Sequence, residues 1–449
     1  MARTPSTTRR SILAGSGAAL TAAALGACTP PNSTETTPRV PVPRADGPVT
    51  LTYWTWFKDL QKVADIFNRS QDHIDVEVVW IPGGDSGGYA KMLSAVAAGG
   101  GPDIGHVDMR SVPEFALAGA LVDLAQYGFA EHEDQFTPMA ISQVKIGDSL
   151  WAVPQDFGPV GTFYNREVLE GEMGLAPPAT WEEFHETAGV VSEAGKSLIS
   201  LDPSEGFLPI SWVMQSGAVW FRPEGDGWIV DMTDDASMRV AEFWDGIFAD
   251  GLVGTGFGAT TTPWYAAAAE GEVLAAVVGS WSDALIETTP GGSGKWAVAP
   301  MPTWADGSGY ASGVHGSSSA VVMSNSEHPA EALEFLTWLS TDPVAIDGMI
   351  DHSGMGWSTS DDYIGESRQG PSEFFSGENY NQDVFVPMAE GQNLEWTWAP
   401  LMQRVSSTVG DGMSAVVTGD TSMVDMFASA QKEIVEIMRT IGLNAEEAR

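Results

Sequence analysis

The stretch IDVEVVWIPGGDSGGYAKMLSAVAAGGGPDIGHVD, residues 74–108, contains the pattern that decides the fold class. Residues 74–81 are rich in β-branched residues and predict a strand, and residues 102–108 predict another. Between them, residues 89–98 predict a helix that stops at three glycines. Strand, helix and strand in this order indicate a unit with parallel strands, so the sequence predicts an α/β fold.

The same alternation of strand and helix continues on both sides of this stretch. Residues 49–54 alternate apolar and polar side chains, which predicts a first strand, and residues 60–67 have helical spacing. Further along, residues 180–183 form a capping box, and Pro329 suits the first turn of a helix. Residues 422–441 predict a long amphipathic helix near the C-terminus.

The segment Gly84-Asp85-Ser86-Gly87-Gly88 within the opening stretch resembles the nucleophile loop of chymotrypsin-type serine proteases. In those enzymes a histidine, an aspartate and most of two β-barrels precede the serine. Here His73 is the only histidine between the N-terminal tether and Ser86, and the surrounding pattern is α/β. We therefore expect a flexible loop in which Asp85 or Ser86 caps the following helix.

Other catalytic and metal-binding signatures are missing from the sequence. It has no G-x-S-x-G motif and no phosphate-binding loop, and its seven histidines lack the spacing of zinc ligands. The sequence therefore predicts no catalytic residue, no cofactor and no metal site. Acid pairs such as Asp234-Asp235 and Asp361-Asp362 suit helix caps and solvated turns, and they leave a glycoside-acting enzyme as the alternative.

The charge of the chain is strongly negative. Its 449 residues include 60 acidic and 21 basic side chains, a formal net charge of -39. Nucleic acids and anionic membrane surfaces are bound through Lys and Arg, so this balance argues against both as main partners. Two interpretations remain open: a charge that keeps a secreted protein soluble, or attraction of a cationic ligand.

The first 48 residues predict export and anchoring. Residues 1–27 combine the twin arginine Arg9-Arg10 with a short apolar run, as in a twin-arginine signal peptide, although ordinary secretion stays possible. Leu25-Gly26-Ala27-Cys28 resembles a bacterial lipobox, so we expect a lipid on Cys28, the only cysteine of the chain. Residues 28–48 are rich in Pro, Thr and Ser and predict a flexible tether. These signals place the protein outside the cytoplasm, attached to the cell membrane.

Tryptophan is unusually frequent, with 17 residues against 8 tyrosines. Several tryptophans lie at strand ends or beside glycines rather than on helices: Trp54, Trp56, Trp281, Trp357, Trp396 and Trp398. An indole face stacks well on the C–H face of a sugar or against a cation. For each of these residues, packing in the core is an equally good interpretation.

Taken together, several segments resemble the sugar-binding extracellular solute-binding proteins of bacterial ABC importers, the maltose-binding-protein-like family 1. The segments occur in the family's order: VTLTYWTW (49–56), YAKMLSAVAAGGGPDIGHVDMRSVPEFALAGALVDL (89–124), WAVPQDFGPVGTFYNREVL (151–169), PATWEEF (178–184), AAAAEGEVLAAVVGSWSDAL (266–285), KWAVAPMPTW (295–304) and HPAEALEFLTWLSTDP (328–343).

The resemblance implies a two-lobed α/β fold of the type II periplasmic-binding-protein kind. Two lobes are joined by several crossing segments, and the ligand cleft lies between them. Lobe one is expected at residues 49–156 plus 303–354, and lobe two at residues 157–302 plus 355–449.

The resemblance also implies which residues contact the ligand: Trp56, Asp108, Asp156, Tyr164, Trp281, His315, Trp357, Trp396 and Trp398. Trp281 matches the stacking aromatic of lobe two, and Asp108 matches an acid that binds sugar hydroxyls. Trp396 and Trp398 are alternatives for one aromatic near the C-terminal helices. Where maltose-binding protein carries an aromatic, this chain has Gly105-His106-Val107, which speaks against maltodextrin as the ligand.

The function implied by the resemblance is a monomeric receptor that performs no turnover. It would capture a mono- or oligosaccharide by closure of the lobes and deliver it to the transmembrane subunits of an ABC permease. A secreted glycoside-acting enzyme, and a binding protein for an amine or other cation, remain the alternatives.

Overall fold

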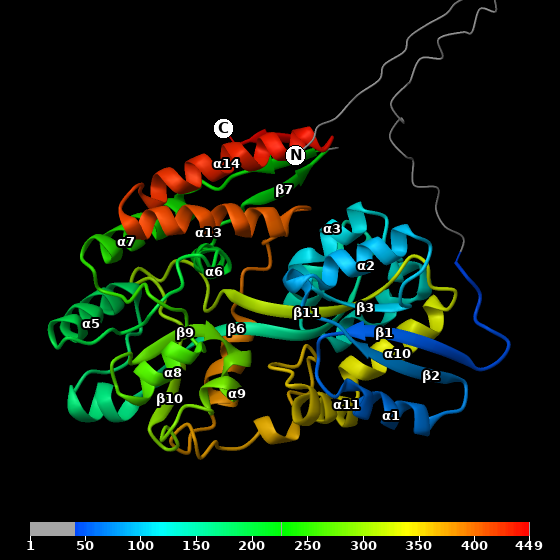
Figure 1. Ribbon diagram of the computed structural model, residues 1–449, viewed down its shortest axis with the longest axis horizontal. Helices are drawn as coiled ribbons and strands as arrows, with labels where there is room; N and C mark the ends of the chain where they lie inside the picture. Colours follow the sequence, from blue (N-terminus) through cyan, green and yellow to red (C-terminus); the bar gives the residue numbers. More distant parts are fainter. Residues whose placement is uncertain (1–40, 226, 449) are drawn as a thin grey trace, which may run out of the picture. The chain divides into compact units, whose positions relative to one another are not determined.

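The computed structural model describes residues 41–225 and 227–448 (Figure 1). The predicted signal peptide at residues 1–27, Cys28 and the tether as far as residue 40 lie outside this range. Within the described residues, no helix is both long enough and apolar enough to cross a membrane.

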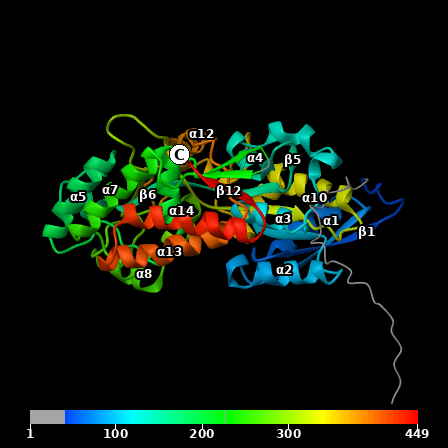
Figure 2. The ribbon, with the colours of Figure 1, turned by 90° about the horizontal axis from the view of Figure 1, so that it is seen from above.

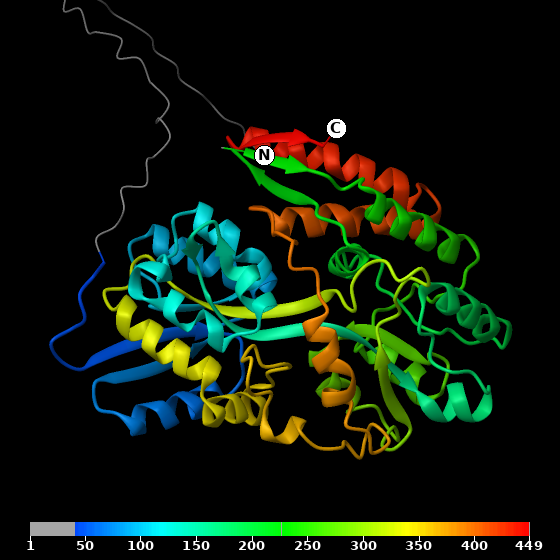
Figure 3. The ribbon, with the colours of Figure 1, turned by 180° about the vertical axis from the view of Figure 1, so that it is seen from behind.

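One seven-stranded sheet extends through both halves of the protein, in the order β10-β6-β11-β3-β1-β2 with β9 also paired to β6. Its strands are β1 Val49–Thr55, β2 Ile74–Trp80, β3 Ile104–Asp108, β6 Val153–Asn165, β9 Ala275–Gly279, β10 Trp296–Pro300 and β11 Val314–Val322. Figures 1 and 3 show the long strands β6 and β11 running side by side from one half into the other.

Lobe one is built around β1, which pairs in parallel with β2 and with β3. The strand–helix–strand unit predicted from residues 74–108 is thereby confirmed as β2, α2 and β3. The helices of this lobe are α1 Leu60–Ser70, α2 Gly88–Ala97, α3 Val112–Leu117, α4 Pro138–Val144, α10 Pro329–Thr341 and α11 Pro343–Gly348. Its shorter elements are η1 Gly84–Ser86, η2 Met109–Ser111, η3 Leu124–Tyr127, η4 Phe129–Gln135, η7 Met349–Ser353, β4 Lys145–Ile146 and β5 Ser149–Leu150.

Lobe two carries most of the helices. They are α5 Trp181–Glu193, α6 Phe207–Ser216, α7 Asp235–Ala249, α8 Thr262–Ala269, α9 Asp283–Ile286, α12 Val386–Glu390, α13 Met402–Thr418 and α14 Met423–Thr440. The remaining elements are η5 Glu167–Glu172, β7 Phe221–Glu224, β8 Gly227–Val230, η6 Ser280–Ser282, η8 Glu366–Arg368, η9 Asn381–Phe385 and β12 Asn444–Glu447. The two longest helices, α13 and α14, lie side by side (Figure 2).

The sheet is mixed rather than parallel throughout. Only β1, β2 and β3 are parallel neighbours, whereas β11 is antiparallel to both β3 and β6, and β6 is antiparallel to β9 and β10. Within this sheet the expectation of parallel strands therefore holds only in lobe one, and in lobe two β12 pairs in parallel with β8 in a separate three-stranded sheet. The physical reason is that β6 leaves lobe one while β11 returns to it, so two adjacent crossing strands necessarily run in opposite directions.

The buried side chains of the two lobes form separate cores, and these cores locate the crossings. Trp304 and Val314 pack in the core of lobe two, whereas Val322 packs in lobe one. The chain therefore returns to lobe one along β11, later than the expected boundary at residue 303. A third crossing follows Met355, where Ser358 pairs with Asp156 of β6.

The predicted helix starts are confirmed, but the predicted cap in the glycine-rich loop is wrong. The Thr180 side chain accepts a hydrogen bond from the Glu183 N–H, and α10 begins at Pro329. Helix α2, however, has Gly87 as its N-cap, with φ 106° and no side-chain cap, so neither Asp85 nor Ser86 occupies that position. A glycine stands there because only glycine adopts this backbone conformation without strain.

Candidate ligand cleft

On lobe one, the candidate wall of the ligand cleft is a cluster of stacked aromatic rings at the carboxyl ends of β1 and β3. Trp56 lies on the imidazole of His106, with ring centroids 3.6 Å apart and planes at 15°. Tyr89 meets the edge of Trp56 at 5.9 Å, and its hydroxyl oxygen accepts a hydrogen bond of 2.9 Å from the Asp108 N–H. Trp56 and Asp108 are partly exposed, so both face solvent from a rigid base.

His106 is a buried part of this wall. Burial holds the pKa of its imidazole well below the usual value, and its Nδ1 lies 2.9 Å from the Thr55 hydroxyl. Because a neutral imidazole is flat and polarisable, it can support the Trp56 ring as a phenyl ring would. The absence of an aromatic residue from Gly105-His106-Val107 therefore does not leave the wall without a stacked ring.

Arg110 connects the two lobes across the cleft. It donates a hydrogen bond to Asp108 Oδ2 at 3.1 Å, and its guanidinium carbon lies 5.3 Å from the centre of the Phe207 ring. Phe207 begins α6 of lobe two and stacks on His315 at 5.9 Å and on Trp398 at 5.8 Å. The contacts from lobe one to lobe two therefore run from Trp56 and Tyr89 through Asp108 and Arg110 to the rings of Phe207 and Trp398.

The lobe-two side of the cleft contains a cavity of about 220 Å³. Trp281, His315 and the strand β9 form one side of it, and the segment from Ile199 to Leu208 forms another. The charged side chains lining it are Asp202 and Glu205. Both already accept hydrogen bonds from nearby backbone N–H groups, Asp202 from Ser204 and Glu205 from Phe207 and Leu208. Glu205 therefore stabilises the start of α6, and Asp202 stabilises the turn before it.

Two hydrogen bonds fix Trp281 and His315 in this cavity. The Trp281 indole N–H donates to the His315 carbonyl oxygen at 2.6 Å, and the Gly279 N–H donates to His315 Nδ1 at 3.3 Å. Since Nδ1 is an acceptor, the ring proton belongs on Nε2, which makes that atom a hydrogen-bond donor. Burial lowers the pKa of the His315 imidazole, so the neutral form is favoured.

Asp156 and Trp357 lie at the crossings, as expected. Asp156 Oδ1 accepts a hydrogen bond of 2.8 Å from the Trp357 N–H, which ties β6 to the third crossing segment. Burial raises the pKa of Asp156 to about 6, against the opposing effects of backbone hydrogen bonds and of Arg368. The Trp357 side chain is buried against Phe385 and also lines a different cavity, of about 330 Å³.

Three of the expected contact residues are buried away from the cavity beside Trp281. Tyr164 pairs with Ala275, at the opposite end of β9 from Gly279, and its hydroxyl donates to Glu170 at 2.6 Å. Four residues along a strand correspond to about 13 Å, so Tyr164 lies far from the Trp281 end of β9. Trp398 supports Phe207 from behind, and Trp396 packs behind Trp398 at 5.5 Å.

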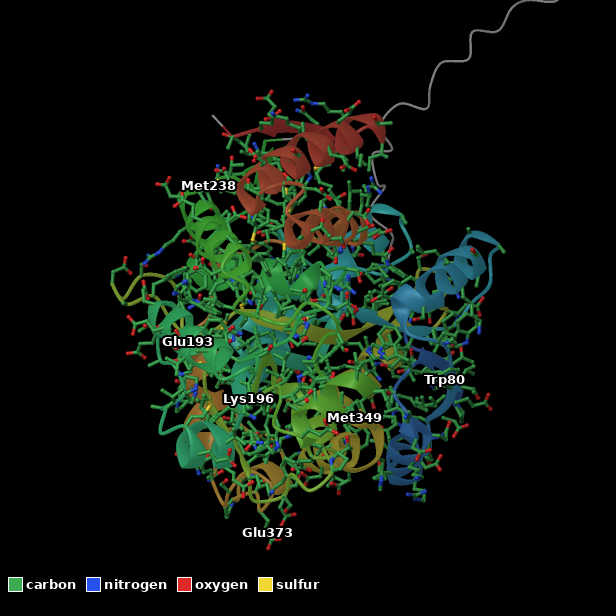
Figure 4. All side chains as sticks on the ribbon, turned by 60° about the vertical axis from the view of Figure 1, so that its left-hand side comes forward. Trp80, Glu193, Lys196, Met238, Met349 and Glu373 are labelled. Carbon is green, nitrogen blue, oxygen red and sulfur yellow. The ribbon has the colours of Figure 1, made fainter. Side chains whose placement is uncertain are left out.

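The sequence analysis missed Phe207, Tyr89 and Arg110. Phe207 lies two residues after Glu205, whose carboxylate accepts a hydrogen bond from the Phe207 N–H at the start of α6. An aromatic residue in the first turn of a helix is common, so nothing in the sequence indicated that Phe207 lies in the cleft. Tyr89 and Arg110 lie within a segment that the resemblance already included, but no spacing rule distinguishes them. Conversely, Trp80 is 61% exposed at the end of β2, an edge strand, so an unusual tryptophan is not by itself a mark of the cleft (Figure 4).

No group of three or more potential metal ligands occurs among residues 41–225 and 227–448. The cleft contains flat ring surfaces and hydrogen-bond donors and acceptors that could bind hydroxyl groups. The two lobes meet across it. Such a site suits a small polar solute held by stacking and hydrogen bonds.

Two α/β lobes, three crossing segments and an aromatic cleft define a type II solute-binding fold. The profile of the family described as bacterial extracellular solute-binding protein matches residues 36–346, and the chain belongs to this family. The predicted fold class is confirmed by a solved structure from Bifidobacterium longum, the galacto-N-biose/lacto-N-biose I-binding protein of an ABC transporter in complex with lacto-N-biose. It superposes with a TM-score of 0.80 and 25% identity, over 90% of this chain and 100% of that chain.

Curated relatives match over a shorter range. The lactose-binding protein of Rhizobium radiobacter is 28% identical over 59% of this chain and 61% of its own length. The arabinooligosaccharide-binding protein of Bacillus subtilis is 23% identical over 55% of this chain and 57% of its own length. The chain therefore spans about three fifths of the length of these relatives.

Proposed function

We propose that this protein binds a mono- or oligosaccharide between its lobes and delivers it to the transmembrane subunits of an ABC permease. The observation that carries the proposal is the cavity beside Trp281, where an indole face lies next to the Nε2 donor of His315. A sugar ring has an apolar C–H face for the indole and hydroxyl oxygens for the imidazole. Its relatives are named for the saccharides that they bind, which supports this class of ligand.

The proposed contacts come from both lobes and from a crossing strand. Trp56 and Asp108 would bind the solute from lobe one, Trp281 and His315 from lobe two, and Asp156 from β6. Trp357, Trp396, Trp398 and Tyr164 would act as buried support for these groups rather than as direct contacts. Closure over a bound solute would then bring the two sets of groups together.

The proposed location is the outer face of the cell membrane. Cys28 would carry the lipid, and the Pro-rich tether would hold the lobes near the permease. The protein would act as a monomer without turnover. Metabolic labelling with a fatty acid, lost on Cys28→Ser, tests the anchor independently of the ligand.

A titration series tests the ligand class. Lactose, lacto-N-biose, arabino-oligosaccharides, free monosaccharides and a polyamine are each added to the purified chain in a calorimeter, and products are sought by chromatography. We expect heat with one or more saccharides, about tenfold or greater loss of affinity in Trp281→Ala, and no hydrolysis. Heat with the polyamine alone would favour the cation-binding alternative, and saccharide cleavage would favour the enzyme.

A further inference from the structure

The side chain of Trp281 lies where all three crossing segments converge, and glycines surround it. A Cβ atom added to Gly356, on the third crossing, would lie 2.3 Å from Trp281 Cβ. One added to Gly316 of β11 would lie 2.7 Å from Trp281 Nε1, and one added to Gly279 would lie 2.5 Å from the same atom. At Gly356 the added Cβ would also lie 2.5 Å from Trp281 Cα, and at Gly279 it would lie 2.3 Å from the His315 carbonyl oxygen, so no side chain fits at these positions without a shift of Trp281 or its neighbours.

The remaining crossing strand, β6, contributes Gly158. A Cβ there would lie 2.2 Å from the carbonyl oxygen of His315, which is the acceptor of the Trp281 indole N–H. Each of the three crossing segments therefore approaches either Trp281 itself or the carbonyl oxygen that accepts the indole hydrogen bond.

Backbone conformation does not explain these glycines as a group. Gly316 has a φ of 77°, which favours glycine, but Gly158, Gly279 and Gly356 are absent from the positive-φ residues of the described chain. Any residue could adopt their backbone angles, so close approach is the constraint that requires glycine there.

We propose that Trp281 couples the ligand to the hinge: the residue and the acceptor of its indole N–H are held by the three crossing segments, so the position of the indole changes as the lobes rotate. The same indole lines the cavity, so a solute stacked on it favours the lobe arrangement in which the indole lies flat against that solute. This inference rests on the proposed function for the identity of the solute, but the link between indole and hinge is a property of the chain alone.

The first experiment uses the full chain without any ligand. In a Cys28→Ser background, spin labels are attached at two exposed positions, Leu117→Cys in lobe one and Val190→Cys in lobe two. Double electron–electron resonance spectroscopy then measures the distance between the two labels. We expect Gly356→Ala to shift or broaden the distance distribution, because the added methyl group displaces Trp281 from the crossings.

Two control variants separate the hinge from general damage. Gly105→Ala places a methyl group 2.9 Å from Met92 Sδ inside lobe one, and Gly370→Ala meets no atom within 4 Å. Both should leave the distance distribution as in the parent chain. An unchanged distribution in Gly356→Ala, or an equal shift in Gly105→Ala, would overturn the proposal.

A double-mutant cycle tests whether the indole is the link. Gly316→Ala carries both the strain of its positive φ and the clash with the indole, and Trp281→Ala removes only the clash. We expect Gly316→Ala to shift the interlobe distance more in the parent chain than in the Trp281→Ala background, where only the backbone strain remains. Equal shifts in both backgrounds would contradict a role for the indole.

Lactose and lacto-N-biose serve as the probes of coupling to ligand. The proposal expects the probe that binds to narrow the distance distribution of the parent chain and to lose about tenfold in affinity in Gly356→Ala. If a probe binds but Gly356→Ala retains full affinity, the coupling to ligand is refuted. If neither probe binds, the proposed function loses support, while the ligand-free distances still decide the link between Trp281 and the hinge.

Discussion

Among single residues, His315 has the most closely defined chemistry in the cleft. Its Nδ1 accepts from the Gly279 N–H, and protonation would convert Nδ1 into a donor and remove that hydrogen bond. Because the pKa in the folded state is depressed, the stabilisation is present above the unfolded pKa and is lost as the pH falls through the folded pKa. We expect the difference in unfolding free energy between the parent and His315→Gln to shrink from pH 7 to pH 5, as measured by urea denaturation.

Asp156 has the opposite dependence on pH. Its pKa is raised to about 6 by burial, so its contribution is most favourable below the unfolded pKa and is lost as the pH rises through about 6. Asn at this position keeps an acceptor for the Trp357 N–H but carries no charge. We expect Asp156→Asn to gain about 2 kcal/mol relative to the parent between pH 4 and pH 7, because one pKa unit corresponds to about 1.4 kcal/mol. A constant difference across this range would contradict the raised pKa.

At the level of elements, the glycine-rich loop before α2 packs under an aromatic ring of the cleft wall, and we assign it no catalytic nucleophile. Gly84 lies directly under the Tyr89 ring, where an added Cβ would be 2.1 Å from the ring carbon Cζ, whereas Gly83 has no atom within 4 Å of such a Cβ. We expect Gly84→Ala to destabilise the protein by about 1–3 kcal/mol through overpacking, and Gly83→Ala to change stability by less than about 0.5 kcal/mol. Chemical denaturation of both variants provides the comparison, and equal effects would refute the packing role.

A buried ion pair in lobe two links the elements next to Trp281. Arg368 Nη1 donates to Asp283 Oδ2 at 2.6 Å, and the Tyr380 hydroxyl donates to the same oxygen at 2.8 Å. Truncating one partner leaves the other charge buried, which typically costs about 3–5 kcal/mol. We expect Arg368→Met to lower stability by this amount and Asp283→Asn by less, since asparagine still accepts from Tyr380. A loss below about 1 kcal/mol in Arg368→Met would mean that water reaches the site.

At the scale of the whole molecule, a solute that bridges the lobes stabilises the folded chain. Binding to the folded state alone adds about 2.7 kcal/mol at a ligand concentration one hundred times the dissociation constant. We therefore expect a matching sugar to raise the melting temperature and to reduce the radius of gyration measured by X-ray scattering. A rise in melting temperature without compaction would indicate binding to one lobe only.

Local signals in the sequence determined the class of fold and many of its elements. The strand–helix–strand unit of residues 74–108 is present as predicted, because period-2 and helical spacing report which face of each element is buried. Likewise, the cap at Thr180 and the start of α10 at Pro329 depend on residues a few positions apart. The resemblance of ordered segments added the two-lobed arrangement.

The structure alone decided which of these residues meet. The Phe207 ring contacts both His315 and Arg110, although these residues are far apart in the sequence. They meet because the crossing strands β6 and β11 bring the two lobes together, so no sequence spacing predicts the contacts. Tyr164 and Trp396, which carry the same aromatic signal as Trp56, lie instead in the core of lobe two. In the glycine string that resembles a protease motif, Gly84 is required by the Tyr89 ring, Gly87 by its positive φ and Gly88 by the Pro82 carbonyl oxygen, 2.4 Å from an added Cβ. Sequence patterns report local periodicity and capping, whereas contacts between distant segments depend on how the lobes pack across the crossings.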